Sequence, residues 1–217
     1  MLDPSEVALI FDLDNTLIHS TIDFRKIRQR LIALLRAAGA PEETDVRLMV
    51  LAIPQLVERG RRHDEALARR MWDVIVEEED LGLKDAAAVE HAADILRELD
   101  HRRFRLGLLT NNRRDATLER LTAFGMRAPF DAIATRDDVA DLKPDPHGVT
   151  YLSARLPGVR RVYVIGDSWV DGQTAEAAGA RFVGFGPREE EVRARGIRPW
   201  AWITDLRELL DLDFAEA

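Results

Sequence analysis

Residues 7–16 read VALIFDLDNT, an apolar run that ends in two aspartates. A continuous apolar run of this length is typical of a strand buried on both faces of a parallel sheet. Asp12 and Asp14 would then lie just past the carboxyl end of that strand, where open α/β sheets bind their ligands. The simpler alternative is an Asp-rich turn at a strand end, with Asn15 accepting the positive φ of the turn.

A second segment, far along the chain, repeats this arrangement. Residues 162–171 read VYVIGDSWVD, so a short apolar run again ends in acids. Asp167 follows the run directly and Asp171 lies one helical turn later, a spacing that can bring both carboxylates to one side of a strand-to-helix corner. Four acids from two strand ends can therefore converge, although a capping Asp that opens a helix would explain this segment by itself.

The candidate ligands are all oxygen donors. The chain has no cysteine, and its histidines show no pair at metal-binding spacing. Carboxylate oxygens without sulfur or imidazole favour a hard cation such as Mg²⁺ over zinc.

Two segments between the acid pairs carry groups that suit an anionic substrate. Thr110, Asn111 and Asn112 follow the apolar run at 106–109 and can donate hydrogen bonds to phosphate oxygens. As an alternative, Asn111 or Asn112 caps the helix expected near Arg113. Lys143 stands in the segment DLKPDP at 141–146, and its compact ammonium suits a crowded anionic site. Its alternative is a solvated surface lysine.

Taken in order, these four segments resemble the haloacid dehalogenase superfamily, specifically its phosphoglycolate-phosphatase-like phosphatases with a small helical cap inserted after the first strand. The resemblance covers residues 7 to about 185. Residues 12–16 match the nucleophile loop, Thr110 and Asn111 the second motif, Lys143 the third, and residues 166–171 the fourth. Asn15 stands where many members carry glycine, and asparagine tolerates a left-handed turn well.

The resemblance implies a role for each group in hydrolysis of a phosphate monoester. Asp12 is expected to be the nucleophile that forms an aspartyl-phosphate, and Asp14 the general acid and base. Mg²⁺ is expected to be held by Asp12, the backbone carbonyl of Asp14 and Asp167. Thr110, Asn111 and Lys143 are expected to bind the phosphoryl oxygens. Thr16, Ser168 and Asp171 are expected to contact and orient the groups that bind substrate and metal.

The periodicity predicts an α/β protein with a doubly wound, Rossmann-like parallel sheet and an inserted all-helical cap. Residues 1–18 and 83–217 are expected to form the core and residues 19–82 the cap. Cap helices are predicted at 21–38, at 42–58 with a kink or break at Pro54, and at 64–78. Core helices are predicted at 85–99, 113–124, 146–156 and 170–178, and strands at 104–109, 162–165, 181–185 and 200–203, before a short closing helix. Trp200 and Trp202 are interpreted as packing residues.

Composition limits the partners. The net charge is −8 over 217 residues, which argues against a nucleic-acid or membrane partner because both carry negative charge. Without cysteine or a signal peptide the chain is expected to be cytoplasmic. A monomer or a homodimer is expected.

Rival functions remain open. A sugar phosphomutase would use the same chemistry, and a binding protein could retain the fold without turnover. Dehalogenases lack an acid at the position of Asp14, and the phosphonate-cleaving members use a cap lysine, for which only Lys26 and Lys84 are candidates.

The substrate is expected to be a small phosphorylated metabolite, without a sequence feature that separates phosphoglycolate, sugar phosphates and nucleotides. His19, Ser20, Thr21 and Arg25 are candidates to face the leaving group. Two arginine clusters, at 59–62 and at 69–70, either hold a second anionic group or form a solvated helix face.

Overall fold

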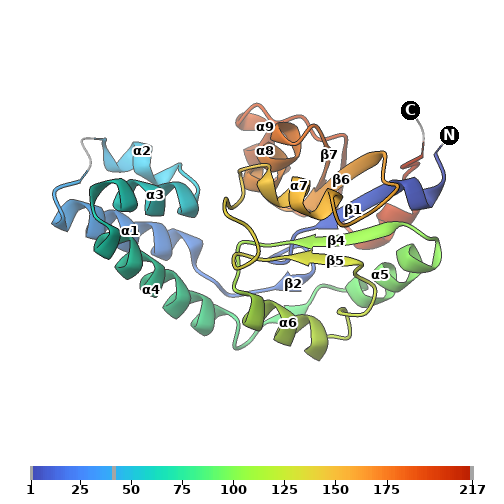
Figure 1. The fold of residues 1–217 in the computed structure, drawn as a ribbon, viewed down its shortest axis with the longest axis horizontal. Coiled ribbons are helices and arrows are strands. Elements are labelled where there is room, and N and C mark those ends of the chain that lie inside the picture. Colours follow the sequence, from blue (N-terminus) through green and yellow to red (C-terminus); the bar gives the residue numbers. More distant parts are fainter. Residues whose placement is uncertain (1, 41–42, 216–217) are drawn as a thin grey trace. The chain divides into compact units, whose positions relative to one another are not determined.

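The structure is a computed structural model that describes residues 2–40 and 43–215. The chain divides into two compact units (Figure 1): a core unit of residues 1–19 and 87–217, and a cap unit of residues 20–86. The second boundary lies beyond the expected residue 82 because backbone bonds continue the helical turn after Gly82, from Leu83 to Glu79 and from Ala86 to Leu83.

The core unit is built on a six-stranded sheet with the order β5-β4-β1-β6-β7-β8, and every neighbouring pair is parallel. All five residues of β1 are buried, as the continuous apolar run predicts. The strands are β1 (Val7–Phe11), β4 (Arg105–Leu109), β5 (Ala132–Ala134), β6 (Arg161–Gly166), β7 (Arg181–Phe185) and β8 (Ala201–Ile203).

Helices alternate with these strands, and Figure 1 shows them on both sides of the sheet. The core helices are α5 (Ala92–His101), α6 (Arg114–Ala123), α7 (His147–Ser153), α8 (Trp169–Ala177) and α9 (Glu189–Ala194), with 3₁₀ turns η1 (Pro4–Glu6) and η2 (Leu206–Asp211). Helix α5 packs on β4, α7 on β4 and β5, and α8 on β6 and β7. The predicted doubly wound α/β class is confirmed.

Several local features differ from the sequence-based predictions. The helix expected at 85–99 begins at Ala92, because residues 87–88 form strand β3 (Ala87–Ala88), which pairs with β2 (Ile18–His19). Strand β5 and helix α9 were missed. Strand β5 reads Ala-Ile-Ala, which has little intrinsic β propensity, so its pairing with β4 makes it a strand. The closing helix is the 3₁₀ turn η2.

The two tryptophans of the last strand region pack as interpreted. Trp200 contacts Tyr163 with ring centroids 4.9 Å apart, and Trp202 contacts Phe182 at 6.4 Å. These edge-on contacts hold β8 against the sheet.

The sheet topology positions the site. The strand order reverses at β1, with β4 and β5 on one side and β6, β7 and β8 on the other. Phe11 is level with Leu108 of β4 and with Ile165 of β6. The residues that follow these strands, Asp12 among them, therefore emerge at one edge of the sheet, at its topological switch point.

The cap unit is helical, with α1 (Phe24–Ala37), α2 (Asp45–Met49), α3 (Ile53–His63) and α4 (Glu65–Gly82) among the described residues. The second predicted cap helix is interrupted between α2 and α3, as expected near Pro54. Pro54 lies in the first turn of α3, where its missing N–H removes no helical hydrogen bond. Glu42, where the second cap helix was expected to begin, lies outside the described residues. Buried Ile27, Leu31 and Leu35 recur at helical spacing on α1.

The two chain connections of the cap unit lie side by side. The backbone N–H of Thr21 donates to Gly82 O at 2.9 Å, and the Thr21 hydroxyl donates to the same oxygen at 3.2 Å. A Cβ on Gly82 would lie 2.5 Å from the backbone of Ile22, so only glycine permits this approach.

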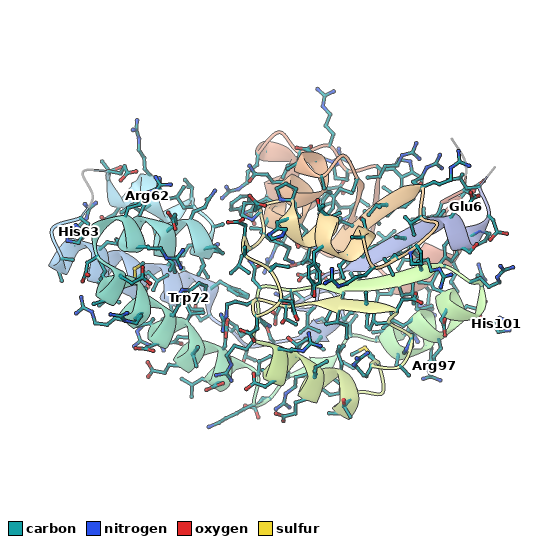
Figure 2. All side chains as sticks on the ribbon, in the orientation of Figure 1. Glu6, Arg62, His63, Trp72, Arg97 and His101 are labelled. Atoms are coloured by element: carbon teal, nitrogen blue, oxygen red, sulfur yellow. The ribbon has the colours of Figure 1, made fainter. Side chains whose placement is uncertain are left out.

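One of the two arginine clusters that were considered for substrate binding, at 59–62, is paired with acids. Arg61 and Arg62, the latter labelled in Figure 2, both pair with Glu58, and Arg59 pairs with Glu43. Lys26 pairs with Glu78 at 2.9 Å. Of the two lysines considered for a phosphonate-cleaving cap, Lys26 is thus already engaged. Across 2–40 and 43–215, the helices include none long and apolar enough to cross a membrane.

Candidate functional site

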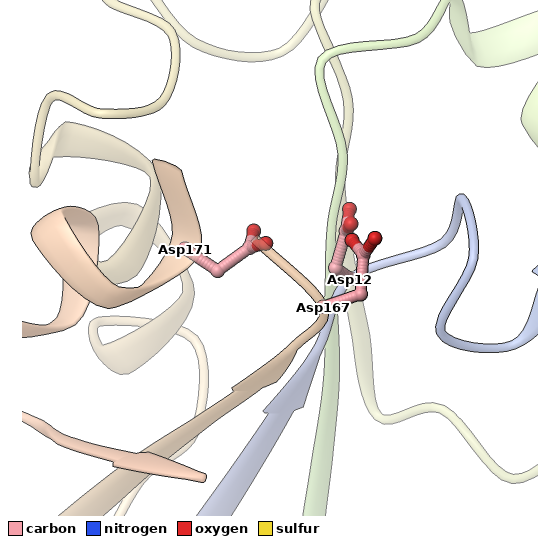
Figure 3. Close-up of side chains that lie close together, drawn as sticks. All are labelled: Asp12, Asp167 and Asp171. Carbon is pink, nitrogen blue, oxygen red and sulfur yellow. The ribbon is translucent and has the colours of Figure 1, made fainter. Parts of the chain in front are cut away.

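Three aspartates meet at the carboxyl edge of the sheet. Asp12 follows β1, Asp167 follows β6, and Asp171 lies in the first turn of α8 (Figure 3). One carboxylate oxygen from each lies within 4.8 Å of the other two, and all three side chains are buried. Three of the four acids that were expected to converge are therefore close together, and Asp14 is not part of this group.

Lys143 joins two of these acids. Its Nζ donates to Asp12 Oδ1 and to Asp171 Oδ1, both at 2.6 Å, and its side chain is only 5% exposed. The alternative of a solvated surface lysine is wrong. A buried ammonium between two carboxylates holds both in fixed orientations.

Asn111 fixes the backbone of Lys143. Its Nδ2 donates to Lys143 O and its Oδ1 accepts from Lys143 N, both at 3.0 Å. Thr110 is buried beside it, and its hydroxyl accepts from the backbone N–H of Asn112 at 3.2 Å. Whether Thr110 and Asn111 also bind phosphate stays a prediction.

Asn112 was considered as a phosphate donor or a helix cap, but its contact with Asp14 was not predicted. Its Nδ2 donates to Asp14 Oδ2 at 2.6 Å, and both side chains are buried. Neither Asn111 nor Asn112 caps the next helix, because Asp137 accepts from the Arg114 N–H at the start of α6. The signal was its place after β4, at the same sheet edge as Asp14.

Asp171 is held from its other side by the turn that begins α8. Its Oδ2 accepts from the Ser168 hydroxyl at 2.6 Å and from the Ser168 N–H at 3.2 Å. Ser168 is the N-cap residue of α8 and Asp171 completes a capping box, so an aspartate does take part in capping this helix as the alternative expected. A Cβ on Gly166 would lie 2.4 Å from Asp171 Cγ, and glycine is therefore required where the two segments touch.

The loop after β1 supports Asp12 and Asp14. Asn15 has a φ of 58°, the left-handed turn that its residue type permits. Thr16 is fully buried, and its hydroxyl has no hydrogen-bond partner among the described residues.

Arg188 is a second cation that the sequence argument missed. Its Nη1 lies 2.9 Å from Asp167 Oδ2, and its side chain is 43% exposed. Arg188 follows β7, the neighbour of β6 in the sheet, and this strand order is not visible in the sequence.

The acids of the site outnumber the cations. Burial and then the Asp171 charge raise the pKa of Asp12 well above its ordinary value, against the opposing effect of Lys143. Burial and Asp171 raise the pKa of Asp167 to about 7, although Arg188 and Lys143 oppose this. Burial lowers the pKa of Lys143, but the Asp12 and Asp171 carboxylates outweigh it and the pKa is raised. Lys143 is therefore charged at neutral pH.

This donor set fits a hard divalent cation. Carboxylate oxygens within 4.8 Å of one another are the ligands that such ions bind, and the surplus of negative charge would be offset by the ion. Such an ion would take the place of the protons that the raised pKa values of Asp12 and Asp167 indicate.

A cavity of about 390 Å³ adjoins Asp167 within the core unit. Asn15 and His19 line it beside Arg188 and Thr204. Of the residues considered for the leaving group, His19 is thus part of this cavity. Ser20, Thr21 and Arg25 belong to the cap unit.

Comparisons with known proteins agree with the fold and the motifs. A family model of haloacid dehalogenase-like hydrolases matches residues 9–185. A phosphoglycolate phosphatase from Cereibacter sphaeroides is 34% identical over 82% of this chain and 84% of its own length.

Two solved structures are similar. A Bacteroides fragilis protein described as a haloacid dehalogenase-like hydrolase is 26% identical, with a TM-score of 0.70 over 93% of this chain and 98% of its own. The magnesium-bound YfnB protein from Bacillus subtilis is 21% identical and shares the fold, with a TM-score of 0.59 over 94% and 96% of the two chains. The family model and the Cereibacter sphaeroides relative confirm the resemblance predicted from the four motifs.

Proposed function

We propose that this chain, which belongs to the haloacid dehalogenase-like hydrolase family, hydrolyses a small phosphate monoester in a magnesium-dependent reaction. The observation that carries the proposal is the buried contact of Lys143 with Asp12 and Asp171. A carboxylate oxygen of Asp167 lies within 4.8 Å of a carboxylate oxygen of each of these two acids. A buried cation and a surplus of carboxylates suit a substrate that is itself an anion and arrives with a metal ion.

Asp12 is the proposed nucleophile. Its carboxylate oxygen attacks phosphorus, the ester P–O bond breaks, and the phosphoryl group remains on Asp12 as an aspartyl-phosphate. Water then attacks phosphorus, releasing inorganic phosphate and the free carboxylate. Lys143 orients Asp12 through the 2.6 Å bond and reduces its repulsion of the incoming phosphate.

Asp14 is the proposed general acid and base. It donates a proton to the leaving alkoxide in the first step and accepts one from the hydrolytic water in the second. Asn112 Nδ2 donates to Asp14 Oδ2 at 2.6 Å and so fixes the orientation of the carboxyl group that transfers the proton. Asn112 is thus a positioning residue for Asp14.

Asp12, the backbone carbonyl of Asp14 and Asp167 would hold the magnesium ion. When bound, the ion would offset the repulsion between the carboxylates and the phosphate and stabilise charge on the transferring group. Asp171 orients Lys143 rather than the ion, because its two oxygens already accept from Lys143 and Ser168. Thr110, Asn111 and Lys143 bind the phosphoryl oxygens, and Thr16 and Ser168 support the two loops.

The relatives support a small phosphorylated substrate, since one that covers most of the chain is a phosphoglycolate phosphatase. The cytoplasmic location and the oligomeric state, monomer or homodimer, stay predictions. A phosphomutase would share every group named above, so it remains the alternative.

A phosphatase assay tests the proposal. The protein should release inorganic phosphate from an aryl phosphate with Mg²⁺, and excess EDTA should stop turnover. Unchanged turnover in EDTA would refute the metal role. Sugar phosphates offered as substrate and as acceptor separate the alternatives, because a mutase yields an isomeric sugar phosphate without net phosphate release.

Three variants test the assignments. Asp12→Asn should abolish covalent phosphorylation. Asp14→Asn should reduce kcat far more for an alkyl phosphate than for an activated aryl phosphate, whose leaving group needs no proton. Asn112→Ala should show the same selectivity in a weaker form, about tenfold on the alkyl substrate. Equal losses on both substrates would contradict the role of Asp14.

A further inference from the structure

The two cations of the site are held in different ways. Lys143 is buried, and its Nζ contacts two acids at 2.6 Å. Arg188 is 43% exposed and contacts Asp167 from the surface, immediately after the Gly186-Pro187 turn. Moving Lys143 would leave two buried carboxylates unpaired, whereas Arg188 can leave Asp167 by rotating into solvent.

A divalent cation on Asp167 would compete with Arg188 for the same carboxylate. Arg188 Nη1 lies 2.9 Å from Asp167 Oδ2, so an ion bound to Asp167 would meet a guanidinium of like charge at close range. Arg188, the exposed cation, is the one that can move away from Asp167. Arg188 therefore occupies Asp167 in the protein without metal, where it offsets part of the surplus negative charge.

The adjoining cavity offers Arg188 a new position. Arg188 already lines this space of about 390 Å³, together with His19 and Thr204. Besides Asp167, two acids line it: Asp205, which pairs with Arg207 at 2.7 Å, and Glu90, whose side chain is 86% exposed. Once released from Asp167, Arg188 would be a cation in a space beside the reacting groups, where an anionic group of a ligand would be its counter-ion.

We propose that Arg188 is a displaceable counter-ion of Asp167, exchanged for the divalent cation and then used to bind an anionic group, of carboxylate type, on the leaving part of the substrate. The proposal rests on the proposed phosphatase function. It assigns the cavity as the subsite for that group and Arg188 as the residue that selects it.

The first experiment compares Arg188→Ala with Arg193→Ala. Arg193 is the matched control because it lies one helical turn further on, is similarly exposed and pairs with Glu189 away from the acid cluster. Arg188→Ala should lower the Tm of the metal-free protein and leave the Tm of the magnesium-saturated protein unchanged. Calorimetric titration with MgCl₂ should show affinity raised by about three- to tenfold, since a competitor is gone. Arg193→Ala should change neither the magnesium affinity nor the difference in Tm between the metal-free and the magnesium-saturated protein.

Two results would overturn the displacement. An equal fall in Tm with and without magnesium would mean that Arg188 stays on Asp167 when the ion binds. Unchanged or weaker magnesium affinity in Arg188→Ala would mean that Arg188 does not compete with the ion. Both readouts are independent of turnover, so they judge the displacement even if the protein proves not to be a phosphatase.

The second experiment reads the subsite. KM is measured for a phosphorylated hydroxy acid and for an alkyl phosphate of the same size without the carboxylate. Arg188→Ala should raise KM for the acid at least about tenfold more than for the neutral ester, and Arg188→Lys should recover part of the loss. An equal rise for both substrates would assign Arg188 to the phosphoryl group and overturn the subsite. Absence of turnover on both substrates in the unmodified protein would instead refute the proposed function.

Discussion

Two clusters of buried charge, one in each unit, are balanced differently. In the cap unit, Glu78 is 5% exposed and is matched by Lys26 at 2.9 Å and Arg30 at 2.7 Å, and hydrogen bonds from these cations lower its pKa. At the sheet edge, burial and neighbouring acids raise the pKa values of Asp12 and Asp167. The cap cluster is complete as folded, whereas the core cluster has more acid than cation. That imbalance supports the proposal that the core cluster binds a ligand.

The largest effect is expected from removing the buried cation. Lys143→Met should reduce turnover by at least ~10³-fold, because Asp12 loses its orientation and the phosphate loses a cation. It should also lower the free energy of unfolding by about 3–5 kcal/mol, because the buried carboxylates would be left without their cation.

Lys26→Met is the matched control, because Lys26 is 51% exposed and Arg30 remains on Glu78. This variant should lower the free energy of unfolding, measured by urea denaturation, by less than about 1 kcal/mol. Similar losses for the two variants would remove the distinction between the clusters.

Asp167→Asn should act in opposite directions on stability and on function. Removing a buried charge from an acid-rich cluster should stabilise the metal-free protein at pH 8 by about 1–3 kcal/mol. The same variant should lose the rise in Tm that MgCl₂ gives the unmodified protein. Glu78→Gln, at the balanced cluster, should instead destabilise the protein. A destabilised Asp167→Asn would show that Arg188 compensates Asp167 fully.

The pH dependence of stability should have opposite signs at the two clusters. The pKa of Asp167 is raised from 3.8 to about 7 in the folded state. Between these values the folded state binds more protons than the unfolded state, so the contribution of Asp167 to stability falls as pH rises toward 7. Glu78 has a lowered pKa, so its contribution is present above the ordinary glutamate value of 4.5 and is lost as pH falls through the lowered pKa.

Thermal unfolding from pH 5 to 8 measures this difference. Without metal, the Tm advantage of Asp167→Asn over the unmodified chain should grow with pH and level off above about 7. Saturating MgCl₂ should suppress the trend, because the ion replaces the proton. A Tm difference that does not change with pH would contradict the raised pKa.

The smallest effect is expected at an exposed arginine of the cap unit. Arg62→Ala should change the free energy of unfolding by less than about 0.5 kcal/mol, because Arg62 is exposed and Glu58 keeps Arg61 as its partner. The KM for phosphate esters should be unchanged within error. A large rise in KM would revive the interpretation of the arginines at 59–62 as an anion site.

Much of the site was predictable because its parts stand where local patterns are strongest. Asp12 and Asp167 each follow an apolar strand, and parallel strands bring such ends to one edge. Lys143 was singled out for its compact ammonium, although its burial was not predictable. The contact of Asn112 with Asp14 was not predicted because it joins residues 98 apart in the chain, and Arg188 was missed because its place depends on the order of β6 and β7.

By itself the sequence determined the elements and the residue types at their ends. Hydrophobic periodicity separates a helical block from an α/β core, and carboxylates after apolar strands indicate metal and phosphate chemistry. The tertiary structure decided which groups touch: Lys143 between Asp12 and Asp171, Asn112 on Asp14, Arg188 on Asp167. It also made strands of Ala132–Ala134 and Ala87–Ala88, which local propensity does not favour. The physical reason is that periodicity is set by neighbours in the chain, whereas pairing, burial and charge balance are set by neighbours in space.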